Sequence, residues 1–212
     1  MYVYYNPPPV TAGWTIDDIS NGFIAPNQYT TNDIICHTNA TAGKGVITVA
    51  AGSKVDLQWT VWPTTHHGPV ITYLAPNTAD SATQDKTALS FVKIDAGGLV
   101  NPTPAPGTWA TDVLIATNNT WTVTIPAKIK AGRYVLRHEI IALQTGGDLN
   151  GAQNYPFCIN LNITGTGTVV PTGGVKGTAL YKPTDAGIHY DIYNNPNKTY
   201  PMPGPAIPAT LK

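Results

Sequence analysis

The chain has 212 residues, and its twelve basic side chains balance its twelve acidic ones, so the formal net charge at neutral pH is zero. Charged residues make up 11% of the sequence, compared with about 25% in typical soluble proteins. There is therefore no basic footprint for nucleic acid or for an anionic membrane. The sequence contains no run of about 18 apolar residues, so it predicts no membrane-spanning helix.

Seven short segments are predicted to be β-strands. In residues 54–61, apolar and polar side chains alternate from Val55 to Val61, which is the period of a half-buried strand. The other six are rich in β-branched and aromatic residues: 46–50, 69–75, 89–95, 119–125, 132–141 and 157–165. The 20 glycines and 19 prolines are scattered and interrupt any long helix. This pattern predicts an all-β sandwich.

Three long stretches between these strands lack a regular pattern: 14–45, 96–112 and 166–212. Loops of more than about 12–15 residues are usually either functional or disordered. These contain tryptophan and tyrosine, for example Trp14, Trp109 and Tyr190, so we expect ordered loops. Residues 200–212 form a proline-rich tail that is expected to be semi-rigid.

The cysteines and the N-x-S/T sequons together favour a secreted protein. The two cysteines, Cys36 and Cys158, are either free thiols or one disulfide. A disulfide closing so long a loop stabilises by roughly 4–5 kcal/mol in the chain-entropy model. Residues 1–10 nevertheless lack the basic and apolar regions of a signal peptide. Four asparagines are candidate N-glycosylation sites: Asn39, Asn118, Asn162 and Asn197.

A histidine pair lies at the start of a predicted strand, in TTHHGPVITYL (64–74). Neighbouring residues of an extended segment point in opposite directions, so at most one of His66 and His67 faces any given site. One interpretation is a metal ligand. The other is a pair of surface loop histidines, and the sequence pattern alone favours it.

Gln153 and Tyr155, in GAQNYPFCIN (151–160), are two residues apart and face the same side of an extended strand. They offer an amide and a phenol to a site. The alternative is a core tyrosine with a hydrogen-bonded tip. Cys158 faces the other side, where a disulfide to Cys36 would anchor the long N-terminal loop.

Charged and titratable residues interrupt an apolar strand at Arg137, His138 and Glu139. Taken alone, this pattern predicts a salt-bridged edge strand. The sequence has no Ser-His-Asp signature, no phosphate-binding glycine loop and no CxxC pair. Acidic residues are few, and none stands out as a glycosidase pair. A neutral surface rich in threonine, asparagine and tyrosine suits an uncharged, hydroxyl-covered partner such as a polysaccharide.

Taken together, these motifs resemble the fungal lytic polysaccharide monooxygenases of auxiliary activity family nine, formerly glycoside hydrolase family sixty-one. The resemblance covers nearly the whole chain, and the HHGP and GAQNYPFC blocks are specific in combination. The blocks that carry it are, in order, IICH (34–37), W-x-x-x-HHGPVITYLA (62–75), WTVTIP (121–126), RYVLRHEIIAL (133–143), GAQNYPFCINL (151–161), GTALY (177–181) and PGP (203–205).

The resemblance implies a single immunoglobulin-like or fibronectin-III-like catalytic domain, spanning 1–212, with one copper ion. It implies a secreted, monomeric enzyme that oxidatively cleaves β-1,4-glycosidic bonds in cellulose or related β-glucans. An external electron donor and O2 or H2O2 serve as co-substrates in this family. Imidazole is a good copper ligand, which agrees with the histidines at the matched positions.

The resemblance also assigns roles to individual residues. His66 matches the second histidine of the copper brace, and His67 is then a bystander. Tyr155 matches the axial tyrosine and Gln153 the glutamine that orients oxygen. The cysteines match the family disulfide, Cys36–Cys158. Aromatic positions of the flat cellulose-binding face match Tyr4 and Tyr193.

Two departures from the family pattern matter. The chain begins with Met1, so the N-terminal histidine, the first strand and the signal peptide of the family are not in the sequence. We therefore expect a truncated copy that is impaired as written. Gln144 occupies a position where the family usually has histidine. The alternatives are a non-catalytic carbohydrate-binding β-sandwich and a structural cell-wall protein.

Overall fold

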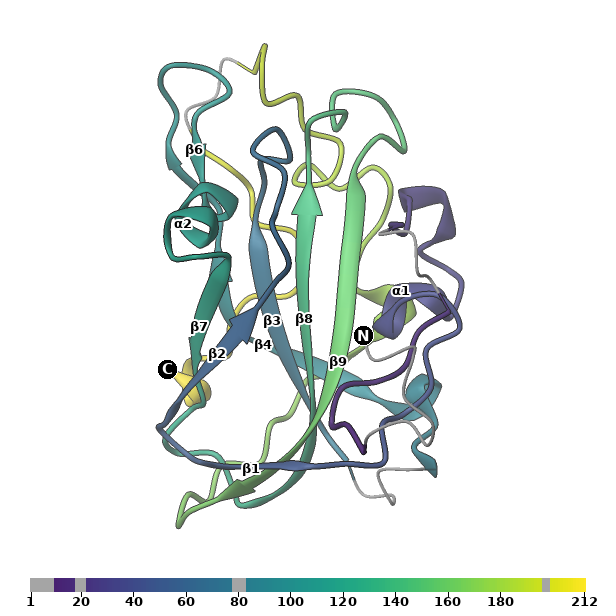
Figure 1. Cartoon of the computed structure of the whole chain (residues 1–212), viewed down its shortest axis with the longest axis vertical. Coiled ribbons are helices and arrows are strands. Elements are labelled where there is room, and N and C mark those ends of the chain that lie inside the picture. The colour runs from purple at the N-terminus through teal and green to yellow at the C-terminus, as the bar shows by residue number, and fades with distance from the viewer. Residues whose placement is uncertain (1–9, 18–21, 78–82, 196–198) are drawn as a thin grey trace.

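The computed structural model describes residues 10–17, 22–77, 83–195 and 199–212. Most strands belong to one large sheet, and a small two-stranded sheet packs across it (Figure 1). The large sheet has the order β1 (Ile47–Ala50), β9 (Gln153–Thr164), β8 (Gly132–Ala142), β3 (Val70–Pro76), β4 (Ser90–Gly97) and β10 (Val175–Lys176). The small sheet pairs β2 (Lys54–Gln58) with β7 (Thr120–Thr124). This arrangement is the predicted β-sandwich.

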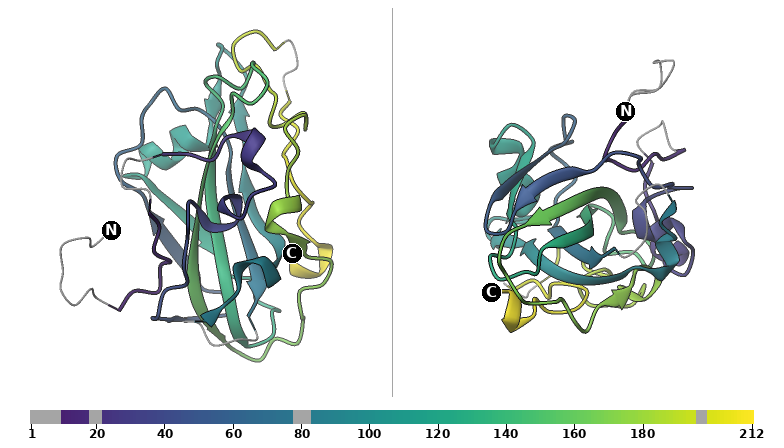
Figure 2. Two further views of the ribbon diagram at one scale, coloured as in Figure 1. Left: turned by 90° about the vertical axis from the view of Figure 1, so that its right-hand side faces the viewer. Right: turned by 90° about the horizontal axis from the view of Figure 1, so that it is seen from below.

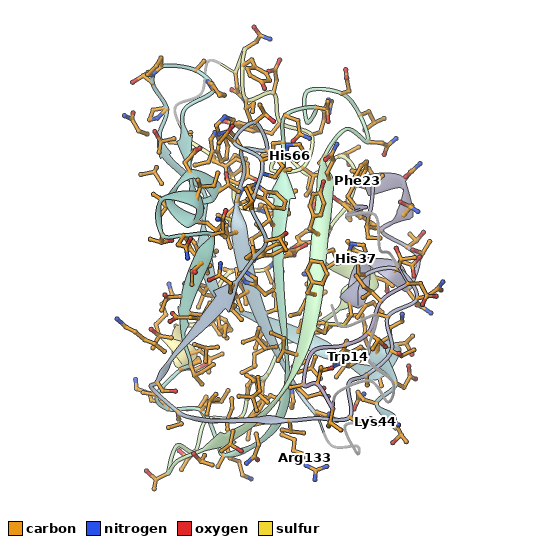
Figure 3. The ribbon with its side chains drawn as sticks, viewed as in Figure 1. Trp14, Phe23, His37, Lys44, His66 and Arg133 are labelled. Carbon is orange, nitrogen blue, oxygen red and sulfur yellow. A yellow bond between two sulfur atoms is a disulfide. The ribbon has the colours of Figure 1, made fainter. Side chains whose placement is uncertain are left out.

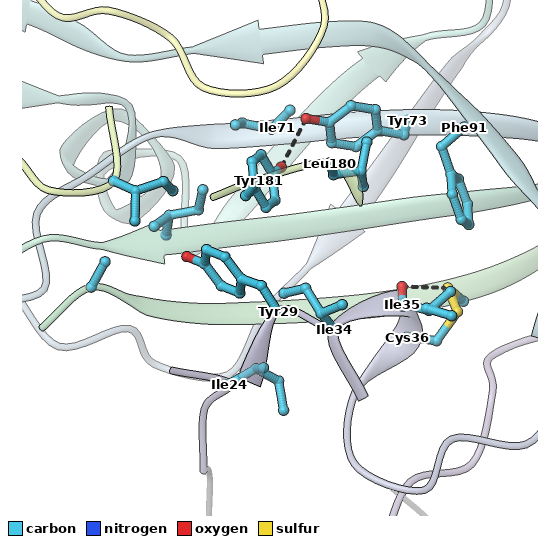
Figure 4. Close-up of a cluster of buried hydrophobic side chains, with 14 of the residues drawn as sticks. Ile24, Tyr29, Ile34, Ile35, Cys36, Ile71, Tyr73, Phe91, Leu180 and Tyr181 are labelled. Carbon is cyan, nitrogen blue, oxygen red and sulfur yellow. Dashed lines mark hydrogen bonds between the residues drawn. A yellow bond between two sulfur atoms is a disulfide. The ribbon is translucent and has the colours of Figure 1, made fainter. Parts of the chain in front are cut away.

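The long strands bury both faces of the large sheet. One face of β8 contributes Leu136 to a core that includes Leu57 of β2 and Val123 of β7. The opposite face contributes Val135 to a second core, which the long loops cover. Tyr73 and Tyr181 meet there through their hydroxyl groups at 2.8 Å (Figure 4). Alternation along the strands therefore builds two cores, one between the sheets and one beneath the loops.

The described parts of the long loops pack their aromatic side chains into the molecule, in agreement with the prediction of ordered loops. Trp14, Tyr29, Trp109, Tyr181 and Tyr190 are all buried. The final segment, coloured yellow in Figure 2, runs along the large sheet. It is held there because the Lys93 ammonium donates to the carbonyl of Pro203 at 2.6 Å.

A disulfide joins Cys36 to Cys158, which rules out free thiols. Cys36 ends the short helix α1 (Asp33–Cys36), and Cys158 lies in β9 on the face covered by the loops. The bond ties the N-terminal loop region to the centre of the sheet, as the position of Cys158 relative to Tyr155 predicts.

Arg137 and Glu139 form a fully buried ion pair in the interior of the large sheet. The prediction of an edge strand is wrong, because β8 lies between β3 and β9. Arg137 also donates to the carbonyls of Ile34 and Ile35, both at 2.8 Å. Burial alone would lower the pKa of Arg137, but the charge of Glu139 more than offsets it and raises that pKa.

The Glu139 carboxylate accepts two further hydrogen bonds. The amide of Asn154 donates to it at 3.0 Å, and the hydroxyl of Tyr181 also donates to it. Asn154 in turn accepts from the Tyr29 hydroxyl at 2.5 Å. One buried network therefore connects β8 and β9 to the N-terminal loop and to the segment that follows β10.

Several elements differ from the prediction. β9 begins at Gln153 and β2 ends at Gln58. Besides α1, a second short helix appears, α2 (Ala110–Ala116), where the Asp112 carboxylate accepts from the Trp109 N–H at 2.7 Å. Short strands β5 (Leu99–Asn101) and β6 (Thr108–Trp109) form a hairpin before it. Within the described ranges, no helix is long and apolar enough to cross a membrane.

Candidate metal site

His66 lies in the loop between β2 and β3, near the upper end of the molecule in Figure 3. The backbone N–H of His66 donates to the carbonyl of Pro63 at 3.0 Å, which closes a turn. The indole N–H of Trp62 donates to the His66 carbonyl at 3.0 Å, and the Trp62 ring meets the imidazole edge-on at 5.8 Å. Backbone and ring are therefore both held by local contacts.

The imidazole of His66 is suited to bind a metal. Partial burial lowers its pKa, and the neighbouring His67 lowers that pKa further. The ring is consequently neutral at neutral pH. Its Nδ1 lies 3.3 Å from the Thr65 hydroxyl. No hydrogen-bond partner of Nε2 is found in the described part of the chain. A neutral imidazole nitrogen with a free lone pair is a ligand that copper and zinc accept.

His67 makes a different set of contacts. Its Nδ1 lies 3.1 Å from the Asp112 carboxylate, the same group that accepts from the N–H of Trp109. His67 thus ties the histidine loop to the start of α2. The two histidines contact different neighbours, as the alternation predicts.

Tyr155 and Gln153 contact each other on β9, because the Tyr155 hydroxyl donates to the Gln153 amide oxygen at 2.9 Å. Tyr155 is 8% exposed, and its ring meets Trp62 edge-on at 5.0 Å. His66 and Tyr155 are therefore both in contact with one indole. The alternative of a core tyrosine with a hydrogen-bonded tip accounts for the burial and the hydrogen bond of this ring equally well.

His66 and Tyr155 also line the same cavity, of about 640 Å3. β2 and the loop after it form one wall, and β9 forms the other. The lining is mainly apolar and aromatic, and the residues that matter below are Asp56, Gln58, Trp59, Trp62, Phe157 and Ile159.

Comparison with known proteins identifies the family of this chain. The family model described as Auxiliary Activity family 9 (formerly GH61) matches residues 2–200. The chain belongs to this AA9 family. It is similar to AA9 family lytic polysaccharide monooxygenase D of Podospora anserina, with 56% identity over 98% of this chain and 60% of that protein. AA9 family lytic polysaccharide monooxygenase B of Aspergillus fumigatus is 55% identical over 98% of this chain and 82% of that protein.

The fold is also similar to solved AA9 structures. The extended catalytic domain of H. jecorina LPMO9A matches with a TM-score of 0.93 and 48% identity, over 100% of this chain and 84% of that one. Cel61B from Hypocrea jecorina matches with a TM-score of 0.89 and 43% identity, over 94% of this chain and 86% of that one. The chain spans 60% and 62% of the length of two of its curated relatives.

Gln144 follows the end of β8, next to the loop that carries His66 and His67. The preceding residue, Leu143, donates its N–H to the carbonyl of His67 at 2.8 Å. The side-chain oxygen of Gln144 is buried and has no hydrogen-bond partner among the residues that the structure describes. An acceptor of this kind is suited to a donor that arrives with a ligand.

His138 has a structural position in the AA9 fold. The indole N–H of Trp59 donates to its Nε2 at 3.0 Å, and its Nδ1 lies 2.8 Å from the Thr72 hydroxyl. Burial, and then the charge of Arg137, lower its pKa to about 3. Because both ring nitrogens are engaged, His138 is not a candidate metal ligand.

Two exposed aromatic side chains concern the predicted binding face. Tyr193 is 50% exposed, whereas Tyr4 lies outside the described residues. Phe23, which the sequence analysis did not single out, is 42% exposed and its ring lies 6.1 Å from that of Tyr155 (Figure 3). A lone aromatic in an irregular loop gave no signal that could have identified it.

The four sequons differ in accessibility. Asn39 and Asn118 are exposed and adopt positive φ angles in turns. Asn162 is half-buried within β9, where a glycan has less room. Asn197 lies outside the described residues. Asn39 and Asn118 are thus the better placed candidates for glycosylation.

Proposed function

We propose that this AA9 chain is the catalytic part of a secreted, copper-dependent polysaccharide monooxygenase that cleaves β-1,4-glycosidic bonds in cellulose or related β-glucans. The observation that carries the proposal is the placement of His66 and Tyr155 around Trp62, at one end of a shared cavity. Family membership and the printed names of the relatives support the same reaction class.

The residues present fit part of a copper site. His66 offers a neutral imidazole nitrogen, and Tyr155 offers a phenol oxygen. No group of three His, Cys, Asp or Glu side chains in the described ranges could hold a metal. Catalytic metal sites usually have about three protein ligands. We therefore propose that His66 and Tyr155 are two of the ligands and that further donors come from outside the described residues.

The cavity offers a place for those donors, because one edge of β2 is unpaired. Trp59 donates its N–H to Asn119 at 2.8 Å, and Ile125 donates to Ser53 at 2.9 Å, so odd-numbered residues of this strand bond to β7. In an antiparallel pair, the backbone groups of the even-numbered residues then point the other way. Those of Asp56 and Gln58 point towards the cavity, and no partner for them is found in the described part of the chain.

We propose that an extended segment from outside residues 1–212 pairs with this edge and brings an N-terminal histidine to His66. The unpaired backbone groups favour a strand as the occupant, since strand addition satisfies them directly. The opposite wall presents Tyr155, Phe157 and Ile159, which are spaced two apart on β9 and so face the same side. Such a strand would complete the small sheet of the sandwich.

The other residues of the site orient and bind. When bound, copper supplies the redox chemistry that activates oxygen or peroxide, with electrons from an external reductant. The Tyr155 hydroxyl engages the Gln153 oxygen, which leaves the Gln153 amide N–H groups free to donate to a co-substrate. The exposed rings of Phe23 and Tyr193 suit stacking on sugar rings of a flat polysaccharide surface.

The test compares residues 1–212 with a longer form that begins with histidine and carries the preceding strand. We expect copper binding of about micromolar affinity or weaker in the short form and at least about 100-fold tighter binding in the long form. Only the long form should release oxidised oligosaccharides from cellulose in a reductant-dependent way, as measured by mass spectrometry.

Nanomolar copper affinity in the short form would refute the proposal that its copper site is incomplete. A long form that adsorbs to cellulose but releases no oxidised product would instead establish the carbohydrate-binding alternative. Both measurements use the same two proteins, so a failure to bind copper and a failure to oxidise are distinguished.

Gln144 is expected to alter how the long form handles its oxidant. Glutamine donates and accepts hydrogen bonds but does not exchange a proton at neutral pH, whereas histidine titrates near pH 6.5. We expect Gln144→His to change the rate of product release by about threefold or more and to add an inflection near pH 6–7. Gln144→Asn keeps the amide and should not add that inflection. An unchanged rate and pH profile in Gln144→His would contradict this expectation.

A further inference from the structure

The turn that carries Tyr193 is built around one carboxylate. Asp191 accepts from the backbone N–H of Tyr193 at 2.8 Å and from that of Asn194 at 3.0 Å. Its second oxygen accepts from the side-chain amide of Asn194 at 3.0 Å. These bonds, the one from the Asn194 side chain most of all, lower the pKa of Asp191. The carboxylate is thus charged and fully engaged with the two residues that follow Ile192.

The residues on either side of Asp191 are fixed in the core. Tyr190 and Ile192 are buried. The Tyr190 ring packs edge-on against Trp109 at 6.0 Å and against Tyr200 at 5.1 Å. Because its neighbours are anchored and its backbone N–H is bonded to Asp191, the half-exposed Tyr193 has little freedom to change its position on the surface.

A second loop packs directly against this turn. The N–H of Tyr190 donates to Gly146 at 2.8 Å, and the imidazole of His189 contacts the Gly147 carbonyl at 3.0 Å. A Cβ at Gly147 would lie 3.2 Å from both Cβ and Cγ of Asp191. Residues 145–151 and 189–194 therefore form one surface unit, here called the Tyr193 platform. It adjoins Gln144, and Leu149 within it is 57% exposed.

We propose that Asp191 is a positioning residue for polysaccharide binding, which holds the Tyr193 ring ready to stack on a sugar ring. A side chain that is already ordered loses less conformational entropy when it binds. Without the carboxylate, the turn must be ordered by the polysaccharide itself, and adsorption weakens. The inference rests on the proposed function, in which Tyr193 faces the polysaccharide.

The experiment measures adsorption isotherms on microcrystalline cellulose for the whole chain and its variants, which requires no copper. We expect Tyr193→Ala to weaken adsorption about tenfold and Asp191→Ala about three- to fivefold. Asp191→Asn keeps an oxygen that accepts both backbone N–H groups, so its loss should stay under about twofold. In the double variant, Asp191→Ala should add nothing to Tyr193→Ala, because Asp191 acts through that ring.

Two further variants separate positioning from charge and from folding. Asp148 belongs to the same platform, and its carboxylate makes no side-chain hydrogen bond within the described ranges. The Asp148→Ala variant should therefore adsorb as strongly as wild type. Gly147→Ala changes no charge but pushes against Asp191, so it should weaken adsorption. Amide hydrogen exchange at Tyr193 and Asn194 should accelerate in Asp191→Ala.

Wild-type adsorption by Asp191→Ala, or an additional loss when it is combined with Tyr193→Ala, would overturn the positioning role while leaving the binding face in place. Wild-type adsorption by Tyr193→Ala would overturn the binding face itself, and the positioning role with it. If Asp191→Ala does not fold, Asp191→Asn and Gly147→Ala decide the question. Equal adsorption by Gly147→Ala and wild type then counts against the proposal.

Discussion

In a form that carries the N-terminal histidine, His66→Ala is expected to abolish reductant-dependent release of oxidised oligosaccharides. It removes the one imidazole of this cavity whose Nε2 has no partner among the described residues. Loss of even an outer hydrogen-bond partner typically costs 10–100-fold in metal affinity. Loss of a ligand should therefore weaken copper binding by more than about 100-fold, measured by isothermal titration calorimetry.

The neighbouring histidine provides a matched control. His67 contacts the Asp112 carboxylate, so His67→Ala should leave copper affinity within about threefold of wild type. The contact between His67 and Asp112 is partly exposed, so His67→Ala should lower the free energy of unfolding by less than about 1 kcal/mol. If both alanine variants weaken copper binding equally, the assignment of His66 as the ligand is wrong.

Glu139→Ala is expected to lower the free energy of unfolding by about 3–5 kcal/mol, since it leaves the buried charge of Arg137 without its partner. The hydroxyl of Tyr181 and the amide of Asn154 lose an acceptor as well. Urea unfolding followed by tryptophan fluorescence measures the change. Lys128→Ala, at an exposed site, should change stability by less than about 0.5 kcal/mol.

The same network offers a second, sharper comparison. Replacing both members of a simple buried ion pair with apolar residues is often neutral. Here Arg137 also donates to the carbonyls of Ile34 and Ile35, which would remain buried and unpaired. Arg137→Met combined with Glu139→Leu should therefore stay at least about 2 kcal/mol below wild type. Recovery of wild-type stability would show that these carbonyls do not depend on Arg137.

Strand locations could be predicted from the sequence, but their neighbours and some boundaries could not. Alternation located β2, and a run of apolar residues located β8. Their pairing partners depend on contacts such as those of Arg137, which no local pattern reveals. Pro156 precedes the predicted start of this strand at residue 157, and proline lacks the N–H of a ladder hydrogen bond. In the structure, Asn154 and Cys158 bond to the outer segments, so Pro156 faces away from β8 and leaves the ladder intact.

The candidate site was predictable to different degrees. The two-residue spacing of Gln153 and Tyr155 predicts that they face the same side of the strand, and the structure adds a hydrogen bond between them. The histidine pair alone favoured a surface loop, and only the family resemblance singled out His66. Phe23 and the platform around Asp191 depend on tertiary contacts between loops. α2 has a capping aspartate, Asp112, but its seven residues are too short for a clear helical period.

The pairing of β1 with β9 determines when parts of the newly synthesised chain can form their native contacts. β1 is parallel to β9, and Cys36 must find Cys158, which lies 122 residues later. At about 5–20 residues per second, ribosomes need roughly 6–24 s to make that interval. During this time β1 lacks its partner strand and Cys36 lacks its disulfide partner. An oxidase that acts in this interval can join Cys36 only to a thiol of another molecule. The native disulfide therefore has to form late in synthesis or after it.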